Sequence, residues 1–177
     1  MLVADAVANF LADKGCKRAF GLIGGGNFVL MDAITRRGYT KITPMHHEQA
    51  AAMSSTYYYR TCGQIAPVLV TTGGGSTNSI TGVMAAYMDS IPLLVISGNE
   101  ASKYMYKHTR VLGVQGFNST LLAIEFTKLA ARPLAHEVIG TLDEGISCAL
   151  GNLGWKDRRQ GPVWIDIPRD VAEMEVK

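Results

Sequence analysis

"APVLVTTGGGSTN", residues 66–78, is a β-rich apolar run that leads directly into three glycines. A short apolar run bounded by glycine predicts a buried strand, here over residues 66–72. The apolar residues that follow recur at helical spacing, and we expect them to form the inward face of a helix. They are Ile80, Val83, Met84, Tyr87 and Met88. The stretch therefore predicts a strand, a glycine turn and a helix in succession.

The same succession occurs once earlier in the chain. "RAFGLI" (18–23) predicts a short buried strand, and "GGGN" (24–27) follows it directly. We expect the next helix to run from about Asn27 to Arg37, with Asn27 available as its N-cap. Both glycine clusters therefore lie where a strand ends and a helix begins, which is where α/β sheets bind ligands.

The rest of the chain continues this alternation. Further strands are expected over 39–43, 91–98 and 161–168, and further helices over 3–11, from Glu48 onward and over 136–152. Residues 99–119 show no clear period, so we interpret them as a long surface loop. Apolar strands that alternate with helices predict an α/β fold, doubly wound, with a mainly parallel sheet and helices on both faces.

Length and composition favour one domain without a membrane or nucleic-acid partner. The 177 residues suffice for a single core, which we place at 1–170, with 171–177 as the start of a linker. The net charge of +2 is too small to indicate nucleic acid, and no apolar run reaches the length of a membrane span. Cys16, Cys62 and Cys148 lack metal-ligand spacing. We expect buried free thiols and a cytoplasmic protein.

The glycine clusters do not match the common nucleotide motifs. In "GGGSTN" the last glycine of GxGxxG is replaced by Asn78, and in "GGGNFV" it is replaced by Val29. No Gly-Lys pair exists, which excludes a P-loop. A dinucleotide site is thus poorly supported, and each turn taken alone fits a tight strand-to-helix connection equally well.

An acid stands at the mouth of an alanine-rich helix in "TPMHHEQAAAM", residues 43–53. Glu48 is either a first-turn acid favoured by the helix dipole or a desolvated carboxylate that binds a ligand. "HHEQ" is not HExxH, and the adjacent His46 and His47 have no further ligand at metal spacing. We therefore predict no metal ligands in this chain.

Three motifs in order carry a resemblance to a known family: "FGLIGGGN" (20–27), "HHEQAAAM" (46–53) and "PVLVTTGGGSTNSITGVMAAYMDSIPLLVISG" (67–98). Together they resemble the N-terminal, pyrimidine-binding (PYR) domain of thiamine-diphosphate-dependent enzymes. The nearest group resembles the acetolactate synthases and 2-oxoacid decarboxylases. The resemblance implies the thiamine-diphosphate-binding fold and a part of a transferase or lyase that acts on a 2-oxoacid.

The resemblance also implies roles for individual residues. Glu48 matches the catalytic glutamate that hydrogen-bonds the aminopyrimidine ring and shares a proton with a ring nitrogen, and Ala50–Ala52 would be small so that the ring can approach. The implied cofactor-binding residues are Gly24, Gly25, Glu48, Thr72, Gly73, Gly74 and Asn78. The implied substrate-side residues are His47, Thr71, Gln115 and Phe117. A packed or surface histidine fits His47 at least as well, and an ordinary surface loop fits the last two equally well. Gly74 stands where the family commonly has proline.

Half of the implied site is missing. Relatives hold the diphosphate through Mg²⁺ on a pyrophosphate-binding domain marked by GDG, and this chain contains no GDG. We expect that domain on the same or another chain, a homodimer or tetramer, and an inactive isolated chain that binds thiamine diphosphate weakly. The alternatives are the α subunit of a split sulfopyruvate- or phosphonopyruvate-type decarboxylase, and a non-catalytic PYR-fold module.

Overall fold

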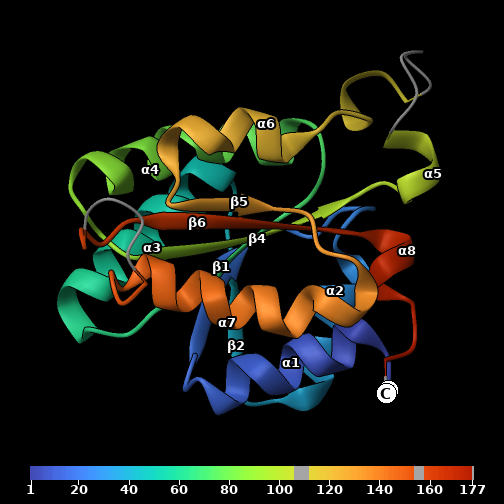
Figure 1. Cartoon of the computed structure of the whole chain (residues 1–177), viewed down its shortest axis with the longest axis horizontal. Coiled ribbons are helices and arrows are strands. Elements are labelled where there is room, and N and C mark those ends of the chain that lie inside the picture. Colours follow the sequence, from blue (N-terminus) through green and yellow to red (C-terminus); the bar gives the residue numbers. More distant parts are fainter. Residues whose placement is uncertain (106–111, 154–157, 177) are drawn as a thin grey trace.

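The computed structural model describes residues 1–105, 112–153 and 158–176, and it forms one parallel sheet between two layers of helices (Figure 1). The strands pair in the order β2-β1-β3-β4-β6-β5, and every pairing is parallel. Their bounds are β1 (Arg18–Gly21), β2 (Lys41–Pro44), β3 (Val68–Val70), β4 (Leu93–Asn99), β5 (Leu129–Ala131) and β6 (Pro162–Pro168). The predicted α/β doubly wound fold is confirmed.

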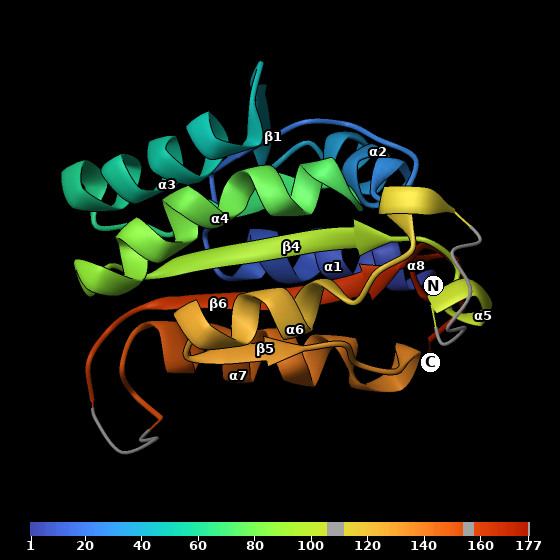
Figure 2. The same ribbon diagram turned by 90° about the horizontal axis from the view of Figure 1, so that it is seen from above.

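Helices cover both faces of the sheet (Figures 1 and 2). One face carries α1 (Val3–Asp13), α2 (Phe28–Arg37), α7 (Val138–Ala149) and the short α8 (Arg169–Ala172). The other carries α3 (Glu48–Cys62), α4 (Gly74–Met88) and α6 (Ser119–Ala123). Short helical segments complete the described chain: α5 (Ser102–Met105), η1 (Gly113–Gln115), η2 (Ile124–Phe126) and η3 (Ala135–Glu137).

The order of the strands places the two glycine clusters side by side. The chain passes from β1 outward to β2 and then returns across β1 to β3, so the direction of winding reverses between β1 and β3. Connections leave the carboxyl ends of these two strands in opposite directions, and α/β sheets bind ligands in the resulting crevice. The first cluster follows β1, the second follows β3, and α3 begins after β2.

Helix α4 agrees only in part with the sequence expectation, because Val83 is buried and Ile80 packs against the core but neither methionine is inward. It begins at Gly74, inside the glycine cluster, and the side chains of Met84 and Met88 are exposed rather than inward. The buried face carries small residues instead: Gly75, Ser76, Ser79, Gly82, Val83 and Ala86. Small side chains allow α4 to lie close against α3, whose Ala52 would be 2.5 Å from a Cβ placed on Gly82. Ala51 and Ala52 are fully buried in this helix contact and core. The small size of these two residues thus serves helix packing, whereas the implied role of half-buried Ala50 beside the ring stays a prediction.

The expected surface loop over 99–119 is wrong for much of its described part. Asn99, Met105 and Ser119 are buried, and α5 and η1 lie within this segment. Residues 106–111 of that expectation lie outside the described residues. Helix α6 and strand β5 were also missed, because they are short and neither follows or contains a long apolar run bounded by glycine.

The end of the chain packs on the domain. Val171 and Ala172 belong to the core beside α1 and α2, and Leu2 forms an antiparallel bridge with Glu175. The expected boundary at 170 falls within α8, and Lys177 lies outside the described residues, so the division into domain and linker stays a prediction. None of the helices in the described ranges is long and apolar enough to cross a membrane.

The three thiols do not share one environment. Cys16 and Cys148 are buried as expected, but Cys62 is exposed because it is the last residue of α3.

Candidate functional site

The first glycine turn is held by the residue expected to cap α2. Asn27 is buried, its Oδ1 accepts from the Gly24 N–H at 2.8 Å, and its Nδ2 donates to the Leu22 carbonyl at 2.9 Å. Asn27 occupies the N-cap position of α2 as predicted, but its side chain makes no capping bond to the helix. The side-chain amide of Asn27 instead bonds the N–H and carbonyl groups that find no backbone partner within the turn.

Thr71 connects the two glycine turns. Its Oγ1 accepts a hydrogen bond from the Gly26 N–H at 3.1 Å. A Cβ placed on Gly24 would lie 2.5 Å from Thr71 Cγ2, and one on Gly75 would lie 2.7 Å from it. Both distances are shorter than side-chain contacts allow, so these two glycines are needed for the close approach of the turns.

Glu48 lies at the mouth of α3 against the second turn. It is the first residue of α3 and only 9% exposed, and its Oε2 accepts from Asn78 Nδ2 on α4 at 3.0 Å. A Cβ on Gly75 would be 3.5 Å from Oε1, so the missing side chain leaves space there. No group in the described ranges donates to Oε1, yet this atom is not fully enclosed. One carboxylate oxygen is thus held and the other is open to a donor.

His47 has a local structural contact. Its Nδ1 accepts from the Gln49 N–H at 3.2 Å and thereby caps α3, and its side chain is exposed. The structure therefore accounts for His47 as the residue that begins the helix carrying Glu48. Sequence reasoning missed this cap, because histidine is not among the residue types that usually occupy that position.

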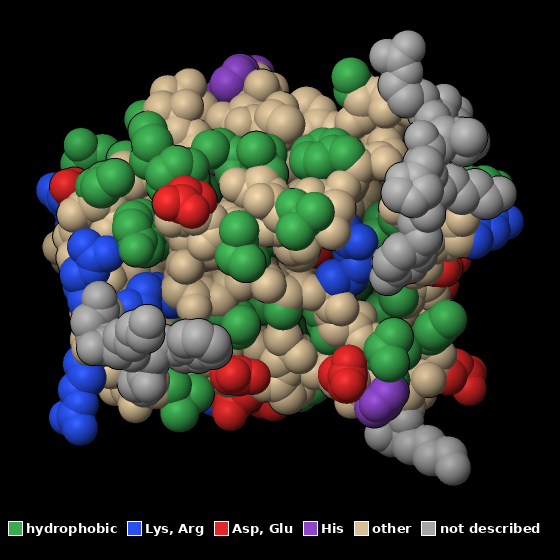
Figure 3. Space-filling model, turned by 45° about the horizontal axis from the view of Figure 1, so that its top comes forward, with side chains coloured by type: hydrophobic (Ala, Val, Ile, Leu, Met, Phe, Trp, Pro, Cys, Tyr) green, Lys and Arg blue, Asp and Glu red, His purple; other side chains and the backbone are tan. Residues whose placement is uncertain are grey.

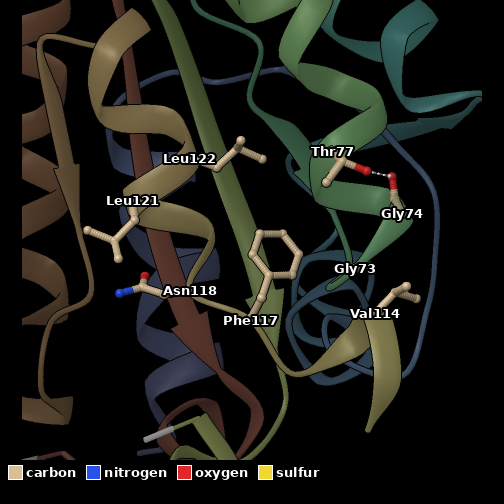
Figure 4. Close-up of a pocket in the computed structure, with 8 residues that line it drawn as sticks. All are labelled: Gly73, Gly74, Thr77, Val114, Phe117, Asn118, Leu121 and Leu122. Carbon is tan, nitrogen blue, oxygen red and sulfur yellow. Dashed lines mark hydrogen bonds between the residues drawn. The ribbon is translucent and has the colours of Figure 1, made fainter. Parts of the chain in front are cut away.

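Beyond the second turn, an apolar cavity that is open to solvent lies between Gly73, the segment 113–118 and α6 (Figure 4). Gly73 has φ 67°, and a Cβ there would lie 2.9 Å from the Val114 carbonyl oxygen, so only glycine fits. The cavity has a volume of about 670 Å³, and the described residues that line it do not include Glu48. They are Gly73, Gly74, Thr77, Val114, Phe117, Asn118, Leu121 and Leu122.

The remaining candidate residues lie either at the glycine turns or at the cavity. The Thr72 hydroxyl contacts Asn99 Oδ1 at 3.0 Å and also the Gln115 carbonyl, while Phe117 projects into the cavity (Figure 4). Gly25 is exposed, and a Cβ there would meet nothing within 4 Å. Leu121 and Leu122 were not foreseen. The Asn118 cap in "NSTLLA" was the signal that could have revealed their helix, since its Oδ1 accepts from the Thr120 N–H at 3.2 Å.

No metal site is evident in the described ranges, where no group of three or more His, Cys, Asp or Glu side chains could hold an ion. At the carboxyl edge of the sheet, a ligand could contact the open oxygen of Glu48, the backbone of the two glycine turns and the apolar cavity. A parallel sheet with paired glycine turns at its reversal point, beside a buried glutamate, is typical of an α/β domain that binds a ligand or cofactor.

Comparison with known proteins identifies the kind of cofactor domain. Residues 1–112 match the family model for the thiamine pyrophosphate enzyme N-terminal TPP binding domain. The chain belongs to this family, and the resemblance noted in the sequence is confirmed.

Individual relatives agree with the family. The acetolactate synthase large subunit of Buchnera aphidicola subsp. Acyrthosiphon pisum is 34% identical over 98% of this chain. The acetolactate synthase isozyme 3 large subunit of Escherichia coli is 34% identical over 95%. A probable chloroplastic acetolactate synthase 2 of Oryza sativa is 27% identical over 97%. The chain spans 29%, 28% and 24% of these three relatives, respectively.

Proposed function

We propose that this chain is the pyrimidine-binding half of a thiamine-diphosphate-dependent 2-oxoacid carboligase or decarboxylase of the acetolactate synthase type. The observation that carries the proposal is Glu48, a nearly buried carboxylate with one oxygen held by Asn78 and the other open. The acetolactate synthase names of its relatives support this type over a split sulfopyruvate- or phosphonopyruvate-type decarboxylase.

The residues present fit a flat, nitrogen-containing ring. Glu48 Oε1 can exchange a proton with a ring nitrogen, while Asn78 keeps Oε2 fixed at 3.0 Å. The absent side chain of Gly75 leaves space beside that oxygen, and low exposure strengthens the hydrogen bond. Thiamine diphosphate would supply the reactive carbon centre, and this chain would orient it and hold the proton at Glu48.

The other assignments follow from position at the same edge. Gly24, Gly25, Thr72, Gly73 and Gly74 belong to the turns beside Glu48, and we assign their backbone to the cofactor. We assign Thr71, Gln115 and Phe117 to the substrate side. Of these three only Phe117 lines the cavity, which would take the apolar part of a small 2-oxoacid. His47 would serve the substrate side through its placement of α3.

The proposal requires a partner domain. We propose that a pyrophosphate-binding domain of the same or another chain holds the diphosphate and Mg²⁺, in a cytoplasmic homodimer or tetramer. The relatives are more than three times as long as this chain, which supports further domains. The face formed by α4 and α6 carries exposed apolar side chains (Figure 3), which suits an interface.

The decisive experiment is Glu48→Gln in the full-length natural protein. Glutamine keeps an amide oxygen for Asn78 but cannot exchange the proton, so turnover of 2-oxoacid should fall by about a hundredfold or more. The unfolding midpoint should change little, because shape and burial are preserved. Unchanged turnover would mean that Glu48 is not the catalytic acid, and would favour a non-catalytic PYR-fold module.

A second experiment uses the isolated 177-residue chain with thiamine diphosphate and Mg²⁺. We expect weak binding by calorimetry and no turnover, because the diphosphate and metal contacts would lie on the partner domain. Tight binding by this chain alone would overturn the division of the site between two domains.

A further inference from the structure

Asp166 is a fully buried carboxylate that accepts hydrogen bonds from three side chains. It lies on β6 with 0% exposure. Arg132 Nε donates to its Oδ2 at 2.7 Å, Asn99 Nδ2 to the same oxygen at 3.0 Å, and Ser97 Oγ to Oδ1 at 2.5 Å. A buried charge is stable only when it is paired and hydrogen-bonded, and these partners meet that requirement.

One arm of this network leads to the second glycine turn. Asn99, at the end of β4 and fully buried, accepts at its Oδ1 from Thr72 Oγ1 at 3.0 Å. The Thr72 hydroxyl has a single proton, which it shares between Asn99 and the Gln115 carbonyl. Thr72 directly precedes Gly73, which lines one wall of the cavity. The Asp166 carboxylate is therefore connected, through Asn99 and Thr72, both to that wall and to the segment 113–118 opposite it.

The other arm leads to the start of α6. The guanidinium of Arg132, only 12% exposed in its side chain, bonds Asp166 through Nε and donates through its terminal Nη2 to Asn118 Oδ1 at 3.1 Å. Asn118 caps α6 and also lines the cavity, next to Phe117 (Figure 4). The rigid fork of arginine lets one side chain hold both partners at once.

We propose that Asp166 and Arg132 are positioning residues. Through Asn99 and Asn118 they fix the two facing walls of the cavity, the Thr72–Gly73 turn and the segment 113–118. Neither Asp166 nor Arg132 lines the cavity. The role of Asp166 and Arg132 is to hold Gln115 and Phe117 against the second glycine turn. The assignment of Gln115 and Phe117 to the substrate side rests on the proposed function.

The first test compares Thr72→Val with Thr72→Ser by amide hydrogen exchange of the full-length protein without substrate. Valine keeps the shape of threonine but removes the proton shared by Asn99 and Gln115, whereas serine retains it. We expect exchange over 113–118 to accelerate about tenfold in the valine variant and to stay native in the serine variant. Exchange in β4 and β6 should be unchanged in both.

Two outcomes would overturn the proposal in this test. Equal exchange over 113–118 in the two variants would mean that the shared proton positions nothing. Equal acceleration in 113–118, β4 and β6 of the valine variant would mean a general loss of stability rather than positioning.

Arg132→Lys provides a second, independent test. Lysine keeps a cation for buried Asp166, so folding is expected, but it cannot also reach Asn118. Exchange over 113–123 should rise about fivefold. The KM for the 2-oxoacid should rise by a similar factor, with kcat changed less than twofold. Native exchange or native KM would contradict the proposal.

The tests separate this inference from the proposed function. Hydrogen exchange is measured without cofactor chemistry. Accelerated exchange in Thr72→Val and in Arg132→Lys therefore supports the positioning role even if Glu48→Gln leaves turnover unchanged. Conversely, a Glu48→Gln protein without activity, together with native exchange in Thr72→Val, would uphold the function and reject the positioning role.

Discussion

Gly74 and Gly75 are neighbours in the sequence with opposite surroundings. A Cβ on Gly75 would lie 2.7 Å from Thr71 Cγ2, whereas one on Gly74 would meet nothing within 4 Å. Gly75→Ala should therefore lower the free energy of unfolding by about 1–3 kcal/mol, as overpacking does. Denaturant titration measures this change.

Gly74→Ala is the matched control for this prediction. Alanine favours the helix at that position, so the free energy of unfolding should be unchanged or raised by up to about 1 kcal/mol. If the two variants were equally stable, Thr71 would have moved aside, and the close contact between the turns would not be rigid.

The thiols differ in reactivity because they differ in burial. Burial raises the pKa of Cys16 from 9.0 to about 11, so its thiol stays protonated at pH 8, whereas Cys62 is exposed. A thiol reagent at that pH should modify Cys62 rapidly and Cys16 only on unfolding. Cys62→Ser should abolish the fast reaction; a fast reaction that persists in this variant would show that a buried thiol is accessible.

The raised pKa of Cys16 also affects stability in alkali. Between pH 9 and 11 the unfolded thiol ionises while the folded one stays protonated, so the folded state binds more protons and stability falls as pH rises. Relative to Cys16→Ala, the free energy of unfolding should fall by about 2 kcal/mol across that interval. Parallel pH profiles of the two proteins would contradict the shift.

At the residue scale, the sequence predicted positions better than contacts. Glu48 stands at the start of α3 as expected, because a helix onset can be recognised from composition. The roles of Asn27 and His47 in local hydrogen bonds were not predicted, since they depend on turn geometry. The Asp166 network joins residues more than 60 positions apart, so the spacing of residues along the sequence does not predict it.

At the scale of elements, glycine decides how closely helices approach. A Cβ on Gly82 of α4 would lie 2.5 Å from Ala52 Cβ, but one on Gly145 of α7 would be 3.6 Å from Ile165 Cδ1, an ordinary contact. Gly82→Ala should destabilise the protein by about 1–3 kcal/mol by pushing α4 from α3. Gly145→Ala should stabilise it by about 0.5–1 kcal/mol, and thermal unfolding compares the two.

The opposite order of stabilities would show that α3 and α4 can separate without cost. Because Glu48 begins α3 and Asn78 lies on α4, a wider helix pair should also lengthen their 3.0 Å hydrogen bond. Gly82→Ala should therefore weaken thiamine diphosphate binding in the full-length protein, while Gly145→Ala should not.

Long, mainly apolar strands and helices were the elements that could be located from the sequence. Strands β4 and β6, each seven residues and fully buried, were located from mainly apolar runs, even though β6 contains Asp166. The inward face of α4 was only partly predicted: Val83 is buried and Ile80 packs against the core, but the methionines face outward and the other core contacts are made by glycine, serine and alanine. Hydrophobic periodicity cannot reveal a face that is buried through small side chains.

At the scale of the whole molecule, winding order brings the candidate site together. Reversal between β1 and β3 places two glycine turns at one point of the carboxyl edge, and α3 adds Glu48 beside them. The fold class was predictable because alternation of apolar strands and helices permits few arrangements. The strand order was not, since pairing across the sheet leaves no local signal.

The exposed apolar face over α4 and α6 gives the last prediction (Figure 3). Met88 is 64% exposed and Ile124 is 61% exposed, on elements that pack together. Large exposed apolar side chains of this kind indicate an interface. We expect the full-length protein to sediment as a dimer or larger, and Met88→Glu with Ile124→Glu to weaken association about a hundredfold by burying charge.

Leu134 is the control for that experiment, because it is 61% exposed but lies beside α7, on the other face of the sheet. Leu134→Glu adds the same single charge as Met88→Glu or Ile124→Glu made alone and removes a similar apolar area, so beside those single variants it should leave the sedimentation profile unchanged. Equal weakening by both changes would point to net charge rather than a specific face. A monomeric native protein at high concentration would reject association through α4 and α6, and with it the homo-oligomer in the proposed function.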